Sequence, residues 1–112
     1  MDFQVYYRSG VVRNLLGMRV DNFNAWVKKG YLVPTERRLN GNLWWDFEAI
    51  VKAYTVKSVA THIGLPPAEA AKTLRALHPR TSTFKNVYAE SMVLSIDVKQ
   101  MRERVTKLIE EL

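Results

Sequence analysis

Four glycine-containing turn signals divide the first two thirds of the chain into short amphipathic segments. They are Gly17, Gly30, Asn40-Gly41 and Gly64. Glycine is favoured just after the last residue of a helix and in tight hairpin turns, so each signal predicts the end of a short element. The chain has 112 residues, close to the commonest size for one domain. We therefore expect one small core, because this length excludes multidomain enzymes and cofactor-binding folds that need a long βαβ series.

Two short helices joined by a tight turn are predicted in the first segments. The first has Ser9 as its expected N-cap and ends at Gly17, with apolar residues at helical spacing between them. The second follows Met18 and ends at Gly30. Its apolar stripe, expected to lie in the core, consists of Val20, Phe23, Trp26 and Val27. Two such helices predict a helix-turn-helix.

A hairpin and two further helices are predicted next. Asn40-Gly41 is a strong two-residue hairpin signal, because both positions tolerate a positive φ, and it would link two very short strands. Asp46 is the expected N-cap of a longer helix that runs to Gly64. The apolar stripe of that helix slips in phase near Thr55, which leaves a kink or burial on all sides open. Pro67 is expected to open another helix. Its predicted inner face consists of Ala70, Ala71, Leu74 and Leu77.

The last third of the chain divides into a stretch without pattern and an amphipathic helix. Residues 78–93 have no sustained period and are expected to form a linker, with an extended stretch at most around Val87. Residues 94–112 regain heptad spacing, with Ser95 as the expected N-cap. The apolar seam consists of Val98, Met101, Val105, Leu108 and Leu112. About two heptads are marginal as an isolated helix, so the seam must pack either on its own domain or on a second copy. Dimerisation is the favoured alternative.

The charge is concentrated in the first third of the chain. Seventeen Lys and Arg against eleven Asp and Glu give a net charge of +6. Residues 8–38 carry seven basic and two acidic side chains, whereas residues 78–112 carry six and five. Such an uneven excess is typical of a face that binds a polyanion, although a merely solubilising surface has the same composition.

Several motifs stand in a fixed order across residues 7–77. They are Leu15-Leu16-Gly17-Met18, Phe23, Trp26, Lys29-Gly30-Tyr31-Leu32-Val33-Pro34, Asn40-Gly41, Asp46 and Ile63-Gly64-Leu65. In this order and spacing the chain resembles the MerR family of bacterial winged-helix regulators. The resemblance implies a mainly α fold, namely a MerR-like winged helix-turn-helix with a small β-hairpin wing and a C-terminal amphipathic dimerisation helix. The chain departs from the family pattern at Arg19-Val20, Asn42-Leu43 and Trp44-Trp45.

The resemblance and the charge together imply a sequence-specific regulator of transcription, of bacterial or phage type, that binds double-stranded DNA. Residues 1–77 would form the DNA-binding domain, 78–93 a linker and 94–112 the dimerisation helix. The second helix would enter the major groove and the wing would lie on the backbone. The expected DNA-binding residues are Arg19, Asp21, Asn22, Asn24, Lys28, Lys29, Arg37, Arg38 and Asn42. The expected partners are duplex DNA and a second copy of the chain, with RNA polymerase or a recombinase as candidate protein partners.

These residue types suit base and backbone contacts. The amides of Asn22 and Asn24 can pair with adenine, the carboxylate of Asp21 can accept from the cytosine amino group, and the cations can hold phosphates. A plain solvated surface is the alternative. Two further alternatives concern other residues. One is stacking of single-stranded nucleic acid on the tryptophans Trp26, Trp44 and Trp45. The other is a second groove-reading helix that presents Lys72 and Arg75.

Other functions are less well supported by the sequence. An excisionase-like factor that bends DNA shares the fold, and a protein-interaction adaptor would use the terminal helix for docking. The chain has no cysteine, two histidines and no catalytic or cofactor motif, so we expect no enzyme activity, cofactor or metal. The chain has no membrane-spanning run, and its first residues, MDFQVYYRSG, lack a secretory signal pattern. We therefore expect a cytoplasmic protein, located at the nucleoid when bound to DNA.

Overall fold

The computed structural model describes residues 4–112, without the side chains of residues 88 and 89. The helices are α1 (Ser9–Leu16), α2 (Val20–Lys28), α3 (Phe47–Ser58), the π-helical turn η1 (Val59–Ile63), α4 (Pro67–Thr73) and α5 (Val98–Glu110). The strands are β1 (Tyr7–Arg8), β2 (Glu36–Arg37), β3 (Leu43–Trp45), β4 (Thr83–Ala89) and β5 (Met92–Asp97).

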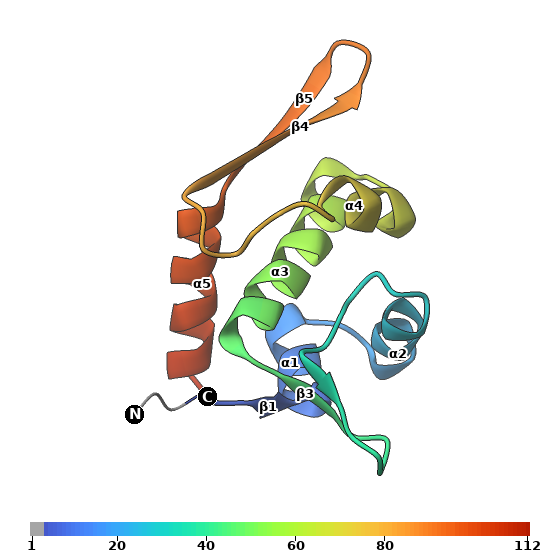
Figure 1. Cartoon of the computed structure of the whole chain (residues 1–112), viewed down its shortest axis with the longest axis vertical. Coiled ribbons are helices and arrows are strands. Elements are labelled where there is room, and N and C mark those ends of the chain that lie inside the picture. The colour runs from blue at the N-terminus through green and yellow to red at the C-terminus, as the bar shows by residue number, and fades with distance from the viewer. Residues whose placement is uncertain (1–3) are drawn as a thin grey trace.

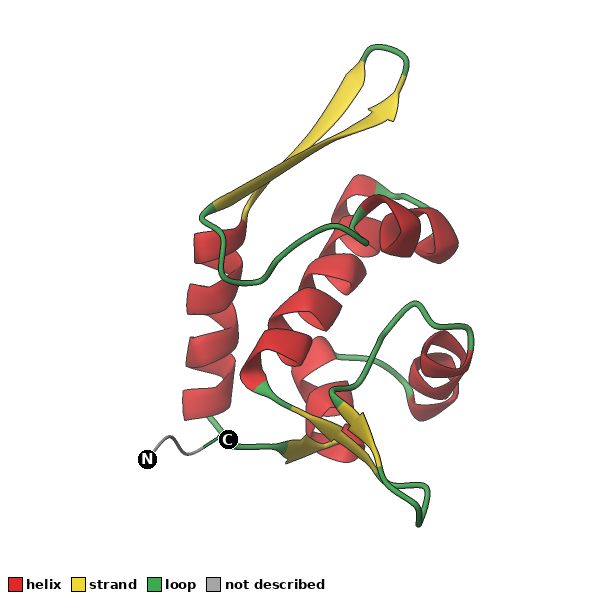
Figure 2. Cartoon of the chain, in the orientation of Figure 1, coloured by secondary structure: helices red, strands yellow, loops and turns green. Residues whose placement is uncertain are grey.

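Helix α3 lies at the centre of the molecule, and the other elements surround it (Figure 1). Helix α5 lies along one side of α3, and α2 lies on the other side. The β4–β5 hairpin projects past the helices at the end opposite the small sheet (Figure 2). The chain is thus a mixed α/β structure, in which five α-helices accompany two antiparallel sheets, rather than the mainly α fold expected. None of the helices in residues 4–112 is long and apolar enough to cross a membrane.

Burial of α3 on several sides explains the phase slip in its apolar stripe. Ile50, Val51 and Val56 are all buried, although they point in different directions around the helix. Thr55 is buried too, and its hydroxyl donates to the carbonyl oxygen of Val51 at 2.8 Å. The helix is therefore buried on several sides, while Lys52 and Lys57 stay half-exposed, and its last turn is π-helical. The helix continues into η1 and ends at Gly64, as predicted.

Of three helix-end signals predicted from the sequence, two are satisfied by partners nearby in the chain and one is not. Gly17 has a φ of +65°, and this left-handed conformation lets the N–H of the next residue, Met18, donate to the carbonyl oxygen of Arg13 at 3.1 Å. The carboxylate of Asp46 accepts from the N–H of Ala49 at 2.9 Å, so this N-cap is confirmed. The prediction for Ser9 is wrong: Arg8 occupies the N-cap position of α1, and the Ser9 hydroxyl instead accepts from Trp45 Nε1 at 3.0 Å.

Phe23, in the middle of the predicted apolar stripe, anchors helix α2 to the core. The Phe23 ring is buried against Trp45, with centroids 5.8 Å apart. Trp26 is half-buried and meets the ring of Tyr31 edge-on at 6.3 Å. Val20 does not lie in the core as expected, since 58% of it is exposed. The reason is its position as the first residue of α2, which reaches the core only from Phe23 onward.

The small sheet has the strand order β1-β3-β2, and β1 was not predicted from the sequence. Strands β2 and β3 are joined by the loop of residues 38–42, in which the N–H of Arg38 donates to the carbonyl of Asn42 at 2.9 Å. The turn at Asn40-Gly41 is therefore longer than the two-residue turn expected. Gly41 has a φ of +84°, whereas Asn40 does not have a positive φ. One left-handed residue after an ordinary turn is typical of a three-residue hairpin loop.

The linker expected over residues 78–93 is wrong, because strands β4 and β5 form a hairpin there. Phe84 pairs with Ile96, and both pack toward the core. Val87 pairs with Val93, and both are exposed. Ser95 belongs to β5 and is not a cap. Helix α5 starts later than expected, with Asp97 as the N-cap, whose carboxylate accepts from the N–H of Gln100 at 3.0 Å.

The seam of α5 packs on its own chain. Val98 and Val105 are fully buried, and α5 contacts both α3 and α1. Met101 and Leu108 are half-buried, whereas 67% of Leu112 is exposed. The intramolecular alternative therefore applies to Val98 and Val105, which are not available to a second copy in this packing. Dimerisation of the protein stays a prediction.

Candidate nucleic-acid interface

All nine residues expected to contact DNA are exposed. Six belong to α2 or its two ends, namely Arg19, Asp21, Asn22, Asn24, Lys28 and Lys29. The other three, Arg37, Arg38 and Asn42, lie at the end of β2 or in the loop of residues 38–42. We use the name α2–loop face for the surface formed by Arg8, the exposed side of α2 and residues 36–42.

The exposed side of α2 follows from the burial of Phe23. Because a helix repeats every 3.6 residues, Asp21, Asn24 and Lys28 fall on one side, away from the Phe23 side chain. Asp21 lies 3.7 Å from Arg19 Nε, and both side chains are largely exposed. An ion pair this exposed contributes little to stability, so both groups can exchange partners readily.

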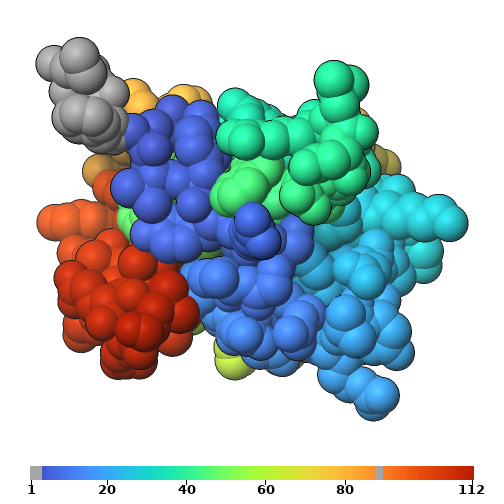
Figure 3. Space-filling view, turned by 90° about the horizontal axis from the view of Figure 1, so that it is seen from below, coloured from blue at the N-terminus to red at the C-terminus, as the bar shows by residue number. Residues whose placement is uncertain are grey.

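A cleft brings the second helix and the loop together. It encloses about 350 Å³ and is lined by Arg8, Ser9, Gly10, Asn24, Gly41, Asn42 and Leu43. Two predicted residues from different elements, Asn24 and Asn42, therefore lie around the same hollow. In Figure 3 the blue surface of β1 and α1 adjoins the light blue of α2 and the green of the loop.

The outer side of the small sheet is organised around Trp44. The Arg8 guanidinium lies 5.3 Å from the Trp44 ring centroid, and that of Arg38 lies 4.7 Å from it. Arg8 is the cross-strand neighbour of Trp44 on β1, and Glu36 is its neighbour on β2. Glu36 also lies 3.8 Å from Arg38. The indole N–H of Trp44 is buried without an acceptor among the described residues.

Arg8 is the residue of this face that the sequence did not single out. It counted toward the basic excess, but its placement beside Trp44 depends on the pairing of β1 with β3. Two residues that pair across 36 positions of sequence leave no local signal. Its position directly before a predicted helix N-cap gave no reason to place it near the hairpin.

The tryptophans differ in their access to a ligand. Trp45 is fully buried, which contradicts the alternative that it stacks on single-stranded nucleic acid. Trp26 packs against Tyr31, and Trp44 is already covered by two guanidinium groups. None of the three tryptophan rings is therefore fully exposed for stacking on a base, which weakens this alternative.

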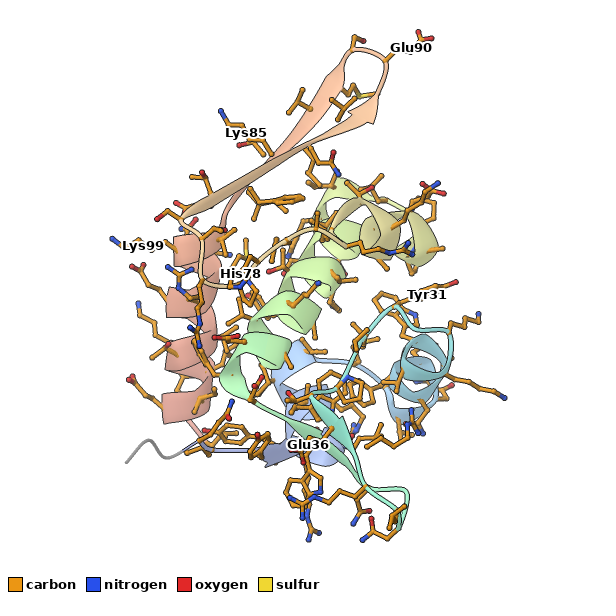
Figure 4. All side chains as sticks on the ribbon, viewed as in Figure 1. Tyr31, Glu36, His78, Lys85, Glu90 and Lys99 are labelled. Carbon is orange, nitrogen blue, oxygen red and sulfur yellow. The ribbon has the colours of Figure 1, made fainter. Side chains whose placement is uncertain are left out.

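Lys29 lines a different cleft from Asn24 and Asn42. This second cleft, of about 370 Å³, lies between the loop that follows α2 and helix α4. Tyr31 lines this cleft too, and Figure 4 shows it beyond the end of α2, far from Glu36 on the sheet. Further cations there are Lys52, Lys72 and Arg75. Lys52 is engaged, because its Nζ donates to the carbonyl oxygen of Arg75 at 3.1 Å.

Comparison with known proteins gives no match, whether to a family model, to a curated protein or to a solved structure. Inferences about function therefore rest on the geometry and charge of the α2–loop face.

Proposed function

We propose that this protein is a sequence-specific double-stranded DNA-binding regulator with a MerR-like winged helix-turn-helix. Helix α2 acts as the recognition helix, and the loop of residues 38–42 acts as the wing. The observation that supports this most is the cleft that Asn24 of α2 and Asn42 of the loop both line, on the most basic part of the chain.

The dimensions of α2 suit a groove reader. Nine residues make a helix about 13 Å long, and the major groove is about 12 Å wide. The exposed flank of α2 carries Asn24, whose amide can donate to and accept from an adenine edge. Val20 adds an exposed apolar side chain at the start of the helix, which can contact a thymine methyl group.

The basic residues of the same face suit the backbone. Arg38 lies in the wing and Arg37 directly before it at the end of β2, both are exposed, and Arg forms bidentate contacts with phosphate. Arg19 and Lys28 lie at the two ends of α2, where the strands that border a groove run past a recognition helix. These contacts are independent of sequence, so they set affinity and salt dependence rather than specificity.

A pair of copies would bind two half-sites about one helical turn, or ~34 Å, apart. Because an excisionase-like factor would instead cover a longer array, a footprint on a selected site separates the two roles. One protected pseudo-palindrome supports the regulator, and a cooperative ladder of sites supports the bending factor.

The test is duplex binding by the full chain as a function of salt. Sites are selected from random duplexes, and affinities are measured between low and physiological salt. The double variant Arg37→Ala with Arg38→Ala should weaken binding to all sequences, and should flatten the slope of log K against log salt by up to about two units. Lys99→Ala is the matched charge control, since Lys99 lies on the outer side of α5 (Figure 4). Binding to protein partners that persists at high salt, without duplex binding at low salt, would instead favour an adaptor.

A further inference from the structure

We propose that Arg8 is an additional phosphate-contacting residue, and that Trp44 is the positioning residue that holds Arg8 and Arg38 for one DNA backbone. This rests on the proposed function and extends it to two residues outside the recognition helix and wing tip. The ligand group is a backbone phosphodiester beside the cleft formed by Arg8, Asn24 and Asn42.

The pairing of the sheet brings the two arginines to the same ring. Strand β3 lies between β1 and β2, so Arg8 and Arg38 approach Trp44 from elements on its two sides. Distances of 5.3 and 4.7 Å from the ring centroid are within the range of a cation–π contact. A long arginine side chain held against a ring has fewer rotamers to lose when it binds, which favours a ready-made contact.

The charge around Trp44 is predominantly positive. Two guanidinium groups converge on Trp44, and the carboxylate that the structure places beside them is that of Glu36, 3.8 Å from Arg38. Arg37 follows Glu36 in the chain and adds a further positive charge to the same hairpin. A phosphate bound beside the sheet would receive charge-assisted hydrogen bonds from guanidinium groups that already lie at Trp44.

The groups around the adjoining cleft are also suited to an anion. The Asn24 and Asn42 side chains offer amide donors, and Ser9 offers a hydroxyl. These groups lie between α2 and the loop, where a backbone would pass if α2 entered the groove. Arg8 therefore lies where the proposed docking requires a cation.

The unsatisfied indole N–H of Trp44 suggests why a tryptophan is used. Within the described part of the chain the buried N–H has no acceptor, so phenylalanine would avoid an unpaired donor at this position. Indole is the aromatic ring with the strongest attraction for cations. A ring chosen for contact with guanidinium groups explains the tryptophan better than packing alone.

The experiment compares salt titrations of duplex binding for the wild type, Arg8→Ala, Trp44→Leu and Trp44→Phe, with Lys99→Ala as control. Arg8→Ala should reduce the salt slope by about 0.9 and weaken selected and unrelated duplexes by the same factor. Trp44→Leu should also weaken binding, and Arg8→Ala should have a smaller effect in that background. Trp44→Phe keeps an aromatic face and should restore part of the loss.

The outcomes separate this inference from the proposed function. A wild type that binds no duplex at low salt overturns the proposed function and the inference with it. A wild type that binds duplex with a steep salt slope, while Arg8→Ala matches Lys99→Ala, overturns the inference alone. Should Trp44→Leu fail to fold, Arg8→Ala and Trp44→Phe still decide, and Arg8→Ala without effect on the slope contradicts the inference. Inorganic phosphate is the remaining probe, and binding of phosphate through Arg8 without any duplex binding would overturn DNA as its source.

Discussion

Asn22 and Asn24 are exposed amides on the two flanks of the buried Phe23 in α2. If the helix reads bases, Asn22→Ala should weaken binding by about 1–3 kcal/mol at one base pair, because a bidentate contact with adenine is lost. Affinities for duplexes that differ at single positions, at constant salt, measure this effect. Asn14→Ala on α1 is the matched control, since Asn14 is also exposed. Equal weakening on every duplex would show that Asn22 reads no base.

The buried aromatic residues should differ in their contribution to stability. Trp45→Ala removes a fully buried ring and its hydrogen bond to Ser9, and we expect a loss of about 3–5 kcal/mol in the free energy of unfolding. Trp26→Ala should lose less, because Trp26 is only half-buried. Denaturant unfolding of both variants checks the order. A larger loss for Trp26→Ala would contradict this account of the core.

Residue-level predictions from sequence are correct where the partner is near in the chain. Asp46 caps a helix by accepting from an N–H three positions away, so the local sequence is sufficient to predict this cap. Ser9 is also a residue type favoured at N-caps, but its hydroxyl bonds to Trp45, a partner that no local sequence pattern could indicate. Val20 has the right spacing for the core and still lies outside it, because spacing does not show where along a helix the packing begins.

Helix α5 offers a sharp test of packing at the level of elements. Val105→Asp places a charge in the contact of α5 with the body, where an unpaired buried charge is strongly unfavourable, and we expect loss of folding. Leu112→Asp lies on the same seam but is exposed, and should change stability by no more than about 0.5 kcal/mol. Thermal unfolding followed by circular dichroism compares the two. Equal stability of both variants would show that α5 does not pack as described.

The elements of residues 9–77 follow well from sequence, and those of residues 78–97 do not. Helices α1 to α4 are marked by glycine, proline and a cap, which act locally. The β4–β5 hairpin alternates inward Phe84 and Ile96 with outward side chains, but its outer side also contains Val87 and Val93. Because apolar residues lie on both sides, the two-residue period is obscured. The cleft of Asn24 and Asn42 could be expected in outline, whereas Arg8 could not, since β1 has only two residues.

Self-association of the whole molecule cannot be tested by substitution in the middle of the α5 seam. An acidic substitution at Val105 would unfold a monomer as readily as it would split a dimer. Sedimentation of the wild type at micromolar concentration tests the proposed homodimer directly. Leu112→Asp, at the exposed end of the seam, is the variant that can weaken a dimer without unfolding the chain.

The β4–β5 hairpin has a consequence for how molecules of this protein behave in concentrated solution. Within the described residues its two strands pair only with each other, so each outer edge presents main-chain donors and acceptors that could extend the sheet with a strand from another molecule. Val87, Met92 and Val93 are exposed near the tip, and charged side chains are sparse there. We expect slow aggregation at high concentration, seen by light scattering, which Val93→Lys should suppress without lowering the unfolding midpoint, because 62% of Val93 is exposed. Unchanged scattering by that variant would mean that the hairpin edges do not template the association of molecules.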